Sequence, residues 1–319
     1  MRAIEVDRFG GPEVLRLVEG PAGPPGAGEA LVDVAAVDVI WVETAIRSGA
    51  MTDWFPQRPP YRPGGGVSGT VAEVGAGVDP AWVGRRMVTR AGGYADQVLV
   101  PVDSLVPVPD GAALPDAAAV TRDGVTAYGL MELLEAGPRD RVLVTAAAGG
   151  MGALLVQLAR AAGATVVGAA RGAAKLDAVR RLGADVAVDY SAPDWTDPVR
   201  AALGGVDVVL DGAGGSYGRE ALDLLVPGGR FSAHGRPAGD FAAPDPDAAR
   251  LRGITTLGIR DVRYAPEQAH RQLVRAVDAL AAGTITPLIG RTFPLERAAD
   301  AHRAIEQRTV VGKALLITR

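Results

Sequence analysis

Residues 141–152 of the chain read RVLVTAAAGGMG, and this stretch decides the fold. It opens with the apolar run 142–144, which has the length and composition of a buried parallel strand. Ala146, Gly149 and Gly152 follow in an AxxGxxG spacing, and the apolar periodicity after them predicts a helix. A strand, a glycine turn and a helix in this order are typical of a dinucleotide-binding unit. Glycine lets the backbone approach a pyrophosphate, and the helix N-terminus offers N–H groups to it.

The composition excludes several classes of protein. The 319 residues are 48% hydrophobic and 22% charged, which suits a globular chain of two domains, and the net charge of −4 argues against nucleic-acid binding. The chain has no Cys, and its three His residues are far apart in sequence, so we expect no metal site. The N-terminal segment lacks an apolar signal core, and no run of about 20 apolar residues occurs, so we expect a cytoplasmic protein without a membrane segment.

Residues 1–122 are predicted to form a small, barrel-like or partly open β-domain. Short apolar or alternating runs are separated there by Gly and Pro clusters, and a brief helical turn is expected at 42–48. The predicted strands are 3–6, 31–37, 69–74, 86–89 and 95–100.

From residue 116 the hydrophobic period changes. A helix is predicted at 116–135, and strands then alternate with helices through residue 261, which indicates a parallel Rossmann-type sheet. The predicted strands are 142–145, 165–169, 186–188, 206–210 and 230–233, and the predicted helices are 151–162, 173–182, 194–203 and 216–225.

Residues 262–319 are too short to fold alone. Helices are expected there at 266–282 and 296–307 and a strand at 313–318, and the segment most simply returns to the first domain. The prediction is therefore an α/β chain in which a Rossmann unit, 123–261, is inserted into a β-domain.

Eight stretches spread from end to end have counterparts in one known family. They are VAAVDVIWVETAIRSG (34–49), RPGGGVSGTVAEVGAGV (62–78), GVTAY (124–128), VLVTAAAGGMGALLVQLARAAGA (142–164), KLDAVRRLGAD (175–185), DVVLDGAGG (207–215), LVPGGRFSAHG (225–235) and GKALLIT (312–318). The chain resembles the zinc-independent quinone oxidoreductase and enoyl reductase branch of the medium-chain dehydrogenase/reductase superfamily, which includes zeta-crystallin-like proteins. This resemblance implies a GroES-like catalytic domain, a Rossmann cofactor domain and a homodimer that pairs through an edge strand near 255–259.

The end of the second predicted Rossmann strand indicates the cofactor. NAD-preferring folds carry an acid there for the ribose 2′-hydroxyl, whereas this chain has Arg171 and, in the next helix, Lys175. Cations suit a 2′-phosphate, so we predict NADPH; solvated charges at a helix start are the alternative. The predicted cofactor-binding residues, several of them by resemblance, are Thr126, Ala146, Gly149, Gly150, Met151, Gly152, Arg171, Lys175, Tyr190, Gly212 and His234.

The resemblance also indicates the chemistry. Zinc-dependent relatives carry Cys at the position of Ile40 and Gly-His-Glu at the position of Gly64–Gly66, so no metal ligands are expected here. Hydride transfer without a metal needs an acceptor that polarises itself, such as a quinone or the C=C bond of an α,β-unsaturated carbonyl compound.

The predicted substrate pocket departs from the quinone reductase pattern. Those enzymes commonly have Asn at the position of Ile40 and tyrosines at two further positions that are not aromatic here. Trp41, Trp54, Phe55 and Tyr61 lie nearby in sequence and are expected to line the pocket, with core packing as the alternative for Trp41. A bulkier or more apolar small-molecule substrate is therefore expected.

Four groups are candidates for acid–base work. Glu43 is one, although an i,i+4 ion pair with Arg47 is its simplest alternative role. Tyr128 lies at a helix start that, by resemblance, is beside the nicotinamide, with helix packing as the alternative. Arg122 suits a substrate oxygen or carboxylate, with a simple ion pair to Asp123 as the alternative. His234 ends a central strand at the edge where cofactors bind, where it would touch the nicotinamide, relay a proton or serve structure only.

Three functions remain open from the sequence. The first is an NADPH-dependent reductase of a quinone or an activated C=C bond. The second is a tailoring reductase or cyclase that acts on a polyketide-like metabolite. The third is an NADPH-binding sensor or crystallin-like protein without turnover, which the missing Asn and tyrosines would explain.

Overall fold

The computed structural model describes residues 1–262 and 264–318, which form two compact units. Unit 1 contains Met1–Arg122, Leu273–Gly283 and the chain from Ile289 onward, and unit 2 contains Asp123–Gln272 and Thr284–Leu288. The predicted return segment 262–319 therefore belongs to unit 1 only in part. The reason is that helix α9 (Pro266–Ala281) continues without a breaker past Gln272, where the chain leaves unit 2.

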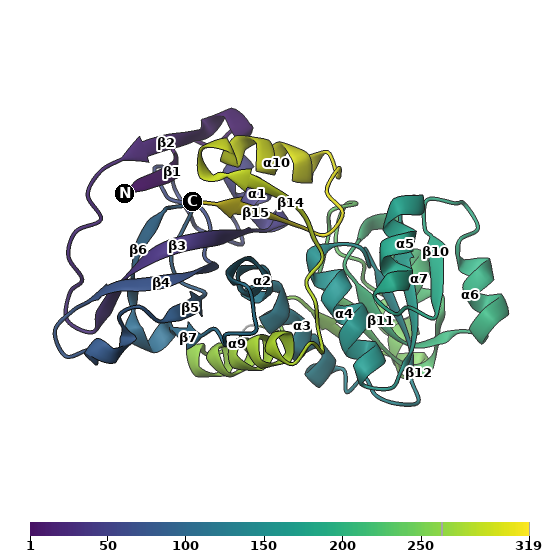
Figure 1. Cartoon of the computed structure of the whole chain (residues 1–319). Coiled ribbons are helices and arrows are strands. Elements are labelled where there is room, and N and C mark those ends of the chain that lie inside the picture. Colours follow the sequence, from purple (N-terminus) through teal and green to yellow (C-terminus); the bar gives the residue numbers. More distant parts are fainter. Residues whose placement is uncertain (263, 319) are drawn as a thin grey trace. The chain divides into compact units, whose positions relative to one another are not determined.

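Unit 1 is built on a seven-stranded sheet of order β14-β15-β3-β4-β5-β7, with β6 paired to β3. Its C-terminal strands lie beside its N-terminal ones, because β15 pairs antiparallel with β3 (Figure 1). Two further strands, β1 (Arg2–Val6) and β2 (Leu15–Glu19), pair as a separate two-stranded sheet. The strands of the larger sheet are β3 (Glu29–Val39), β4 (Val67–Val74), β5 (Arg86–Thr89), β6 (Gln97–Pro101), β7 (Val106–Pro107), β14 (Ile289–Pro294) and β15 (Lys313–Ile317). The helices are α1 (Trp41–Ser48), α2 (Leu114–Val120) and α10 (Ala298–Glu306), with 3-10 turns at Pro12–Val14, Pro80–Trp82, Val102–Ser104 and Leu295–Arg297.

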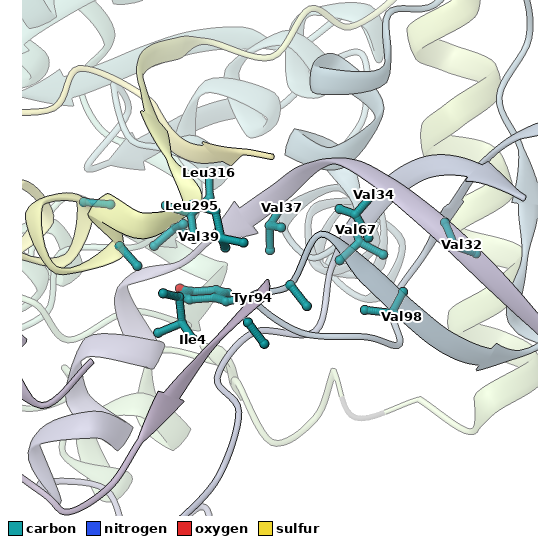
Figure 2. Close-up of a cluster of buried hydrophobic side chains, with 14 of the residues drawn as sticks. Ile4, Val32, Val34, Val37, Val39, Val67, Tyr94, Val98, Leu295 and Leu316 are labelled. Carbon is teal, nitrogen blue, oxygen red and sulfur yellow. The ribbon is translucent and has the colours of Figure 1, made fainter. Parts of the chain in front are cut away.

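Strand β3 runs through the core of unit 1. Its side chains Val32 and Val34 enter the core first, and Val37 and Val39 follow after a one-residue shift in the alternation (Figure 2). The pairing of β3 with β4 shifts register between Val34 and Ala36, and such a bulge moves later side chains to the opposite face. The same strand therefore contributes side chains to the core on both sides of the bulge.

Unit 2 is a six-stranded parallel sheet of order β10-β9-β8-β11-β12-β13, so the predicted Rossmann fold is confirmed. Its strands are β8 (Arg141–Thr145), β9 (Thr165–Ala170), β10 (Val186–Asp189), β11 (Val206–Asp211), β12 (Leu225–Ala233) and β13 (Thr255–Gly258). Its other helices are α3 (Asp123–Leu133), α4 (Gly150–Ala161), α5 (Ala173–Arg181), α6 (Thr196–Leu203), α7 (Gly215–Leu222) and α8 (Pro246–Leu251). The order in which successive strands are added to the sheet reverses between β8 and β11, and such folds bind ligands at this point.

Two predicted helices end differently in the structure. The helix expected at 116–135 is divided into α2 and α3, because Thr121 closes a tight turn through its N–H and its Oγ1, both of which donate to Ala118 O. The helix expected at 216–225 ends at Leu222, and β12 already begins at Leu225.

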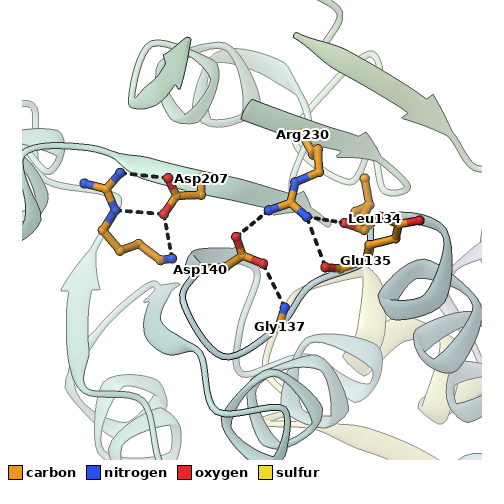
Figure 3. A network of polar contacts seen from close by, with 7 residues as sticks. Leu134, Glu135, Gly137, Asp140, Asp207 and Arg230 are labelled. Carbon is orange, nitrogen blue, oxygen red and sulfur yellow. Dashed lines mark hydrogen bonds and ion pairs between the residues drawn. The ribbon is translucent and has the colours of Figure 1, made fainter. Parts of the chain in front are cut away.

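A polar network fixes the end of β8 that lies away from the glycine turn (Figure 3). Arg230 on β12 pairs with Asp140 and donates to Leu134 O at 2.7 Å, while Asp140 Oδ2 accepts from Gly137 N at 2.8 Å. On β11, which lies between β8 and β12, Asp207 binds the guanidinium of Arg141 through both of its oxygens at 2.8 Å. This bidentate bond lowers the pKa of Asp207, so the carboxylate stays ionised and holds β8 beside β11.

Candidate functional site

The glycine turn of unit 2 folds the backbone of Ala146 tightly against that of Gly149 and Gly152, as a pyrophosphate-binding turn requires. Ala146 adopts a positive φ of 51°, and its carbonyl accepts from Gly149 N at 2.8 Å. A Cβ on Gly152 would lie 2.3 Å from that same oxygen, so only glycine fits there. Gly149 precedes the first residue of α4 and makes no side-chain cap, which leaves the N–H groups of the first turn for a ligand.

A buried hydrogen-bond network lies between β8 and β11, where the sheet order reverses. Thr145 Oγ1 donates to Asp211 Oδ1 at 2.6 Å and accepts from Gly212 N and Ala213 N at 3.0 and 3.1 Å. Asp211 also accepts from Gly214 N at 3.1 Å. Burial raises the pKa of Asp211, and these hydrogen bonds oppose that rise. Sequence reasoning missed this pair, although two polar residues that end adjacent buried strands were a usable signal.

His234 lies close to this network but is a poor proton donor. The side chain is 7% exposed, and burial lowers its pKa to about 3, so the ring is neutral at physiological pH. Its Nδ1 is hydrogen-bonded to Ser232 Oγ at 3.2 Å, and a Cβ on Gly212 would lie 3.2 Å from its Nε2. Of the roles predicted for His234, the structure favours contact or support at the sheet edge over relay of a proton as imidazolium.

The residues predicted for the adenosine end of the cofactor come from neighbouring strand ends. Arg171 follows β9, Lys175 lies half-buried on α5, and Tyr190 follows β10. Arg171 Nη2 donates to Tyr217 Oη at 2.9 Å, and the Tyr217 ring stacks on that of Tyr190 with centroids 4.5 Å apart. Tyr217 was missed because its link to Arg171 crosses 46 residues of sequence.

Thr126 and Tyr128 cannot face one site equally. Both lie on α3 and both are half-buried. Two residues that are two positions apart on a helix point about 200° away from each other. If Thr126 faces the cofactor, Tyr128 therefore points elsewhere, which weakens its candidacy as a catalyst.

In unit 1 the structure brings Glu43 and Arg122 near each other. Glu43 on α1 is 6% exposed. It accepts a hydrogen bond from the Gly64 backbone, and both this bond and the positive charge of Arg122 act to lower its pKa. Burial nevertheless dominates and raises the pKa of Glu43. The alternative ion pair with Arg47 is not formed, because Arg47 pairs instead with Glu306 of α10.

Three consecutive glycines pass beside this acid. A Cβ on Gly64 would lie 2.5 Å from the Tyr94 ring, and a Cβ on Gly65 would lie 2.5 Å from Arg122 Nη1. A Cβ on Gly66 would lie 2.1 Å from Thr121 Oγ1. The segment thus has space for backbone only. By the family resemblance, zinc-dependent enzymes carry metal-ligand residues at these positions.

The predicted pocket aromatics gather around α1. Trp41, Trp54, Phe55 and Tyr61 all pack against the buried residues Ala45, Ile46 and Met51, and all four are half-buried. Ile40 is the N-cap residue of α1, directly before Trp41. Burial and the charge of Glu43 raise the pKa of Tyr61 to about 12, so its hydroxyl stays protonated.

Comparison with known proteins identifies the family. Residues 26–110 match the alcohol dehydrogenase GroES-like domain, and residues 182–316 match the zinc-binding dehydrogenase family. A 2-haloacrylate reductase from Burkholderia sp. and the quinone oxidoreductase of Mus musculus are each 33% identical over 99% of this chain and 98% of their own. The chain belongs to the medium-chain dehydrogenase/reductase superfamily. It is therefore an oxidoreductase with a GroES-like unit and a Rossmann unit.

Solved structures agree with this assignment to the superfamily. The Escherichia coli quinone oxidoreductase complexed with NADPH is 27% identical, with a TM-score of 0.90 and full coverage of both chains. Within residues 1–262 and 264–318, no group of three or more His, Cys, Asp or Glu side chains is arranged to hold a metal ion. In the same part of the chain, no helix combines the length and the apolar character that crossing a membrane demands.

Proposed function

We propose that this protein is an NADPH-dependent reductase that transfers hydride to a quinone or to the C=C bond of an α,β-unsaturated carbonyl compound. The observation that carries the proposal is the pairing of a glycine cradle at Ala146–Gly152 with Arg171 at the end of β9, where NAD-preferring folds carry an acid. The E. coli relative complexed with NADPH supports it.

The residues of unit 2 fit this cofactor. The close approach at Gly152 and the uncapped N-terminus of α4 suit the pyrophosphate, while Arg171 and Lys175 suit the 2′-phosphate. When bound, NADPH supplies the hydride from its nicotinamide ring. A Cβ on Gly212 would lie 3.2 Å from both Thr145 O and His234 Nε2, so a larger side chain would crowd this end of the strands.

The residues of unit 1 suit the other half of the reaction. Hydride addition to a conjugated acceptor leaves negative charge on its oxygen, and a proton must then be added to complete the reduction. We propose that Arg122 stabilises the oxygen and that Glu43, whose raised pKa keeps its proton available, supplies the proton. After proton transfer, the charge of Arg122 and the Gly64 backbone hydrogen bond stabilise the Glu43 carboxylate. Neither step needs a metal ion.

The named activities of the relatives define the acceptors to test. A quinone and a 2-haloacrylate both carry a C=C bond conjugated with an electron-withdrawing group, and relatives named for each are 33% identical to this chain. The half-buried aromatic group around α1 supports a flat, apolar acceptor body.

The test begins with fluorescence titration of NADPH and NADH against the wild-type protein and a variant carrying both Arg171→Ala and Lys175→Ala. We expect the double variant to weaken NADPH binding far more than NADH binding. The control is Arg180→Ala, which removes an exposed charge on α5, the helix of Lys175, and should leave binding of both cofactors unchanged. Quinones, enones and 2-haloacrylates are then added to the NADPH complex. Oxidation by one class supports the proposal. Equal losses for both cofactors would refute the phosphate role, and tight binding without oxidation by any acceptor would favour a specialised substrate or the sensor.

We also propose a homodimer that pairs through β13. This strand lies at the end of the Rossmann sheet, and its residues Thr255 and Thr256 are exposed. An open strand edge is a ready template for another strand. Sedimentation equilibrium should give twice the 32.7 kDa chain mass, and Thr256→Pro should shift the equilibrium to monomer. A monomeric wild type would refute this assembly.

A further inference from the structure

At the carboxyl edge of the Rossmann sheet, Tyr217 contacts the Arg171 guanidinium and stacks on Tyr190. Arg171 comes from the end of β9, Tyr190 from the end of β10, and Tyr217 from the first turn of α7. The Tyr190 and Tyr217 rings stack with centroids 4.5 Å apart and an angle of 26° between their planes. Arg171 Nη2 donates to Tyr217 Oη at 2.9 Å, and its Cζ lies 5.9 Å from the centre of that ring.

The stack restrains a side chain that would otherwise be mobile. Arg171 is exposed, and a long exposed arginine samples many rotamers, which it must give up when it binds an anion. The hydroxyl of Tyr217 fixes one edge of the guanidinium, and the half-buried Tyr190 ring fixes the plane of Tyr217. The guanidinium thus has a hydrogen-bond partner that does not depend on a ligand.

Arg171 also lies near an acid, Asp189, and the uncharged Tyr217 hydroxyl is a partner of a different kind. Asp189 accepts from Gly172 N at 2.9 Å and from Ser191 N at 2.9 Å, and its carboxylate also interacts electrostatically with Arg171. Burial raises the pKa of Asp189, but the hydrogen bonds from Ser191 and Gly172 and the charge of Arg171 outweigh that effect and lower it overall. An arginine that turned fully onto this carboxylate would lose much of its attraction for a phosphate. A hydroxyl partner holds it in place without neutralising it.

We propose that Tyr217, stacked on Tyr190, is a positioning residue that holds the Arg171 guanidinium for the 2′-phosphate of NADPH and so contributes to selection of NADPH over NADH. This inference rests on the proposed function, because it assumes that Arg171 binds that phosphate. It adds a residue that acts through Arg171 and contributes no charge of its own.

The experiment measures binding of two small probes, 2′,5′-ADP and ADP, by titration calorimetry, so that no turnover is needed. The proteins are the wild type, Tyr217→Phe, Arg171→Ala and the double variant. Tyr217→Phe keeps the stacked ring and removes only the hydroxyl, so it also controls for folding. Arg180→Ala on α5 is the matched control for loss of an exposed charge.

We expect Tyr217→Phe to weaken 2′,5′-ADP binding about fivefold, the usual effect of one lost hydrogen bond, with ADP changed by less than about twofold. Arg171→Ala should weaken 2′,5′-ADP binding about tenfold or more. In the Arg171→Ala background, Tyr217→Phe should have no further effect, because Tyr217 acts only through Arg171.

Two results would overturn the inference, and they are distinguishable. If Arg171→Ala weakens 2′,5′-ADP selectively while Tyr217→Phe behaves as wild type, or if the two losses simply add, Tyr217 does not position Arg171, and the proposed cofactor role survives. If Arg171→Ala weakens both probes equally or neither, the phosphate role of Arg171 fails, and the inference fails with it.

Discussion

Replacing Thr145 with Val should destabilise unit 2 and should do so more at neutral than at acidic pH. The substitution keeps the shape of a fully buried side chain and removes a hydroxyl that serves three partners. It deletes a bond to the Asp211 carboxylate, worth about 1.5–3 kcal/mol, and leaves Gly212 N without this acceptor, at a cost of about 1–3 kcal/mol. Because Gly212 is only half-buried and water can compensate there, we take about 3 kcal/mol for the sum.

The sign of the pH dependence follows from Asp211. Its pKa is raised in the folded protein, so the native state holds this proton more tightly than the unfolded chain does. The resulting stabilisation is present below the unfolded pKa and is lost as the pH rises through the folded pKa. The Thr145 hydroxyl opposes the rise, so Thr145→Val raises the pKa of Asp211 further and costs most where the carboxylate is ionised.

Calorimetric melting of the wild type, Thr145→Val and Thr145→Ser between pH 4 and pH 8 tests this argument. For a unit of this size a loss of 3 kcal/mol corresponds to a melting temperature about 6–12 °C lower. Thr145→Ser keeps the hydroxyl and should cost only about 1 kcal/mol for the lost methyl group. Hydrogen exchange of the β8 and β11 amides assigns the transition to unit 2. Equal losses for Val and Ser, or a loss that does not grow with pH, would refute the reasoning.

Three further predictions concern single residues. Glu43→Gln should lower kcat about 100-fold and abolish the decline of wild-type activity as the pH rises through the raised pKa of Glu43; an unchanged pH–rate profile would exclude it as the proton donor. Glu306→Gln should cost about 3 kcal/mol in urea unfolding, because it leaves the buried charge of Arg47 without its carboxylate; a loss below about 1 kcal/mol would mean that water replaces Glu306. Gly152→Ala should weaken NADPH binding about tenfold or more in fluorescence titration, because its Cβ meets Ala146 O at 2.3 Å; unchanged binding would show that the turn relaxes freely.

The Rossmann unit was predictable because its signals are local. A buried parallel strand is a continuous apolar run, its helices carry an apolar stripe, and glycine marks the turn, so each element is encoded within about 12 residues. The errors fall where the local signal is weak. No proline separates α2 from α3 after Pro115, and the turn at Thr121 is visible only through the hydroxyl bond to Ala118 O.

The sequence predicted individual site residues but not the contacts between residues that are distant in sequence. Arg171 could be inferred from its place after a strand, but its partner Tyr217 could not, because the stack with Tyr190 depends on how α7 packs beside the residues that follow β10. The i,i+4 spacing of Glu43 and Arg47 gave a wrong pairing for the same reason. Helix spacing permits that ion pair, and the stronger competitor, Glu306, lies 259 residues away from Arg47.

The C-terminal segment of unit 1 determines the electrostatics of its N-terminal segment. Three buried polar residues there take their partners from the end of the chain: Arg47 from Glu306, Tyr94 from His302, and Asp38 from Lys313. Without Glu306, Arg47 would be drawn towards the nearest carboxylate of its own helix, Glu43, and would lower the pKa of that acid. By binding Arg47, the C-terminal helix leaves burial as the dominant effect on Glu43. The proposed proton transfer thus uses a pKa that burial raises and that Arg47, bound to Glu306, does not lower.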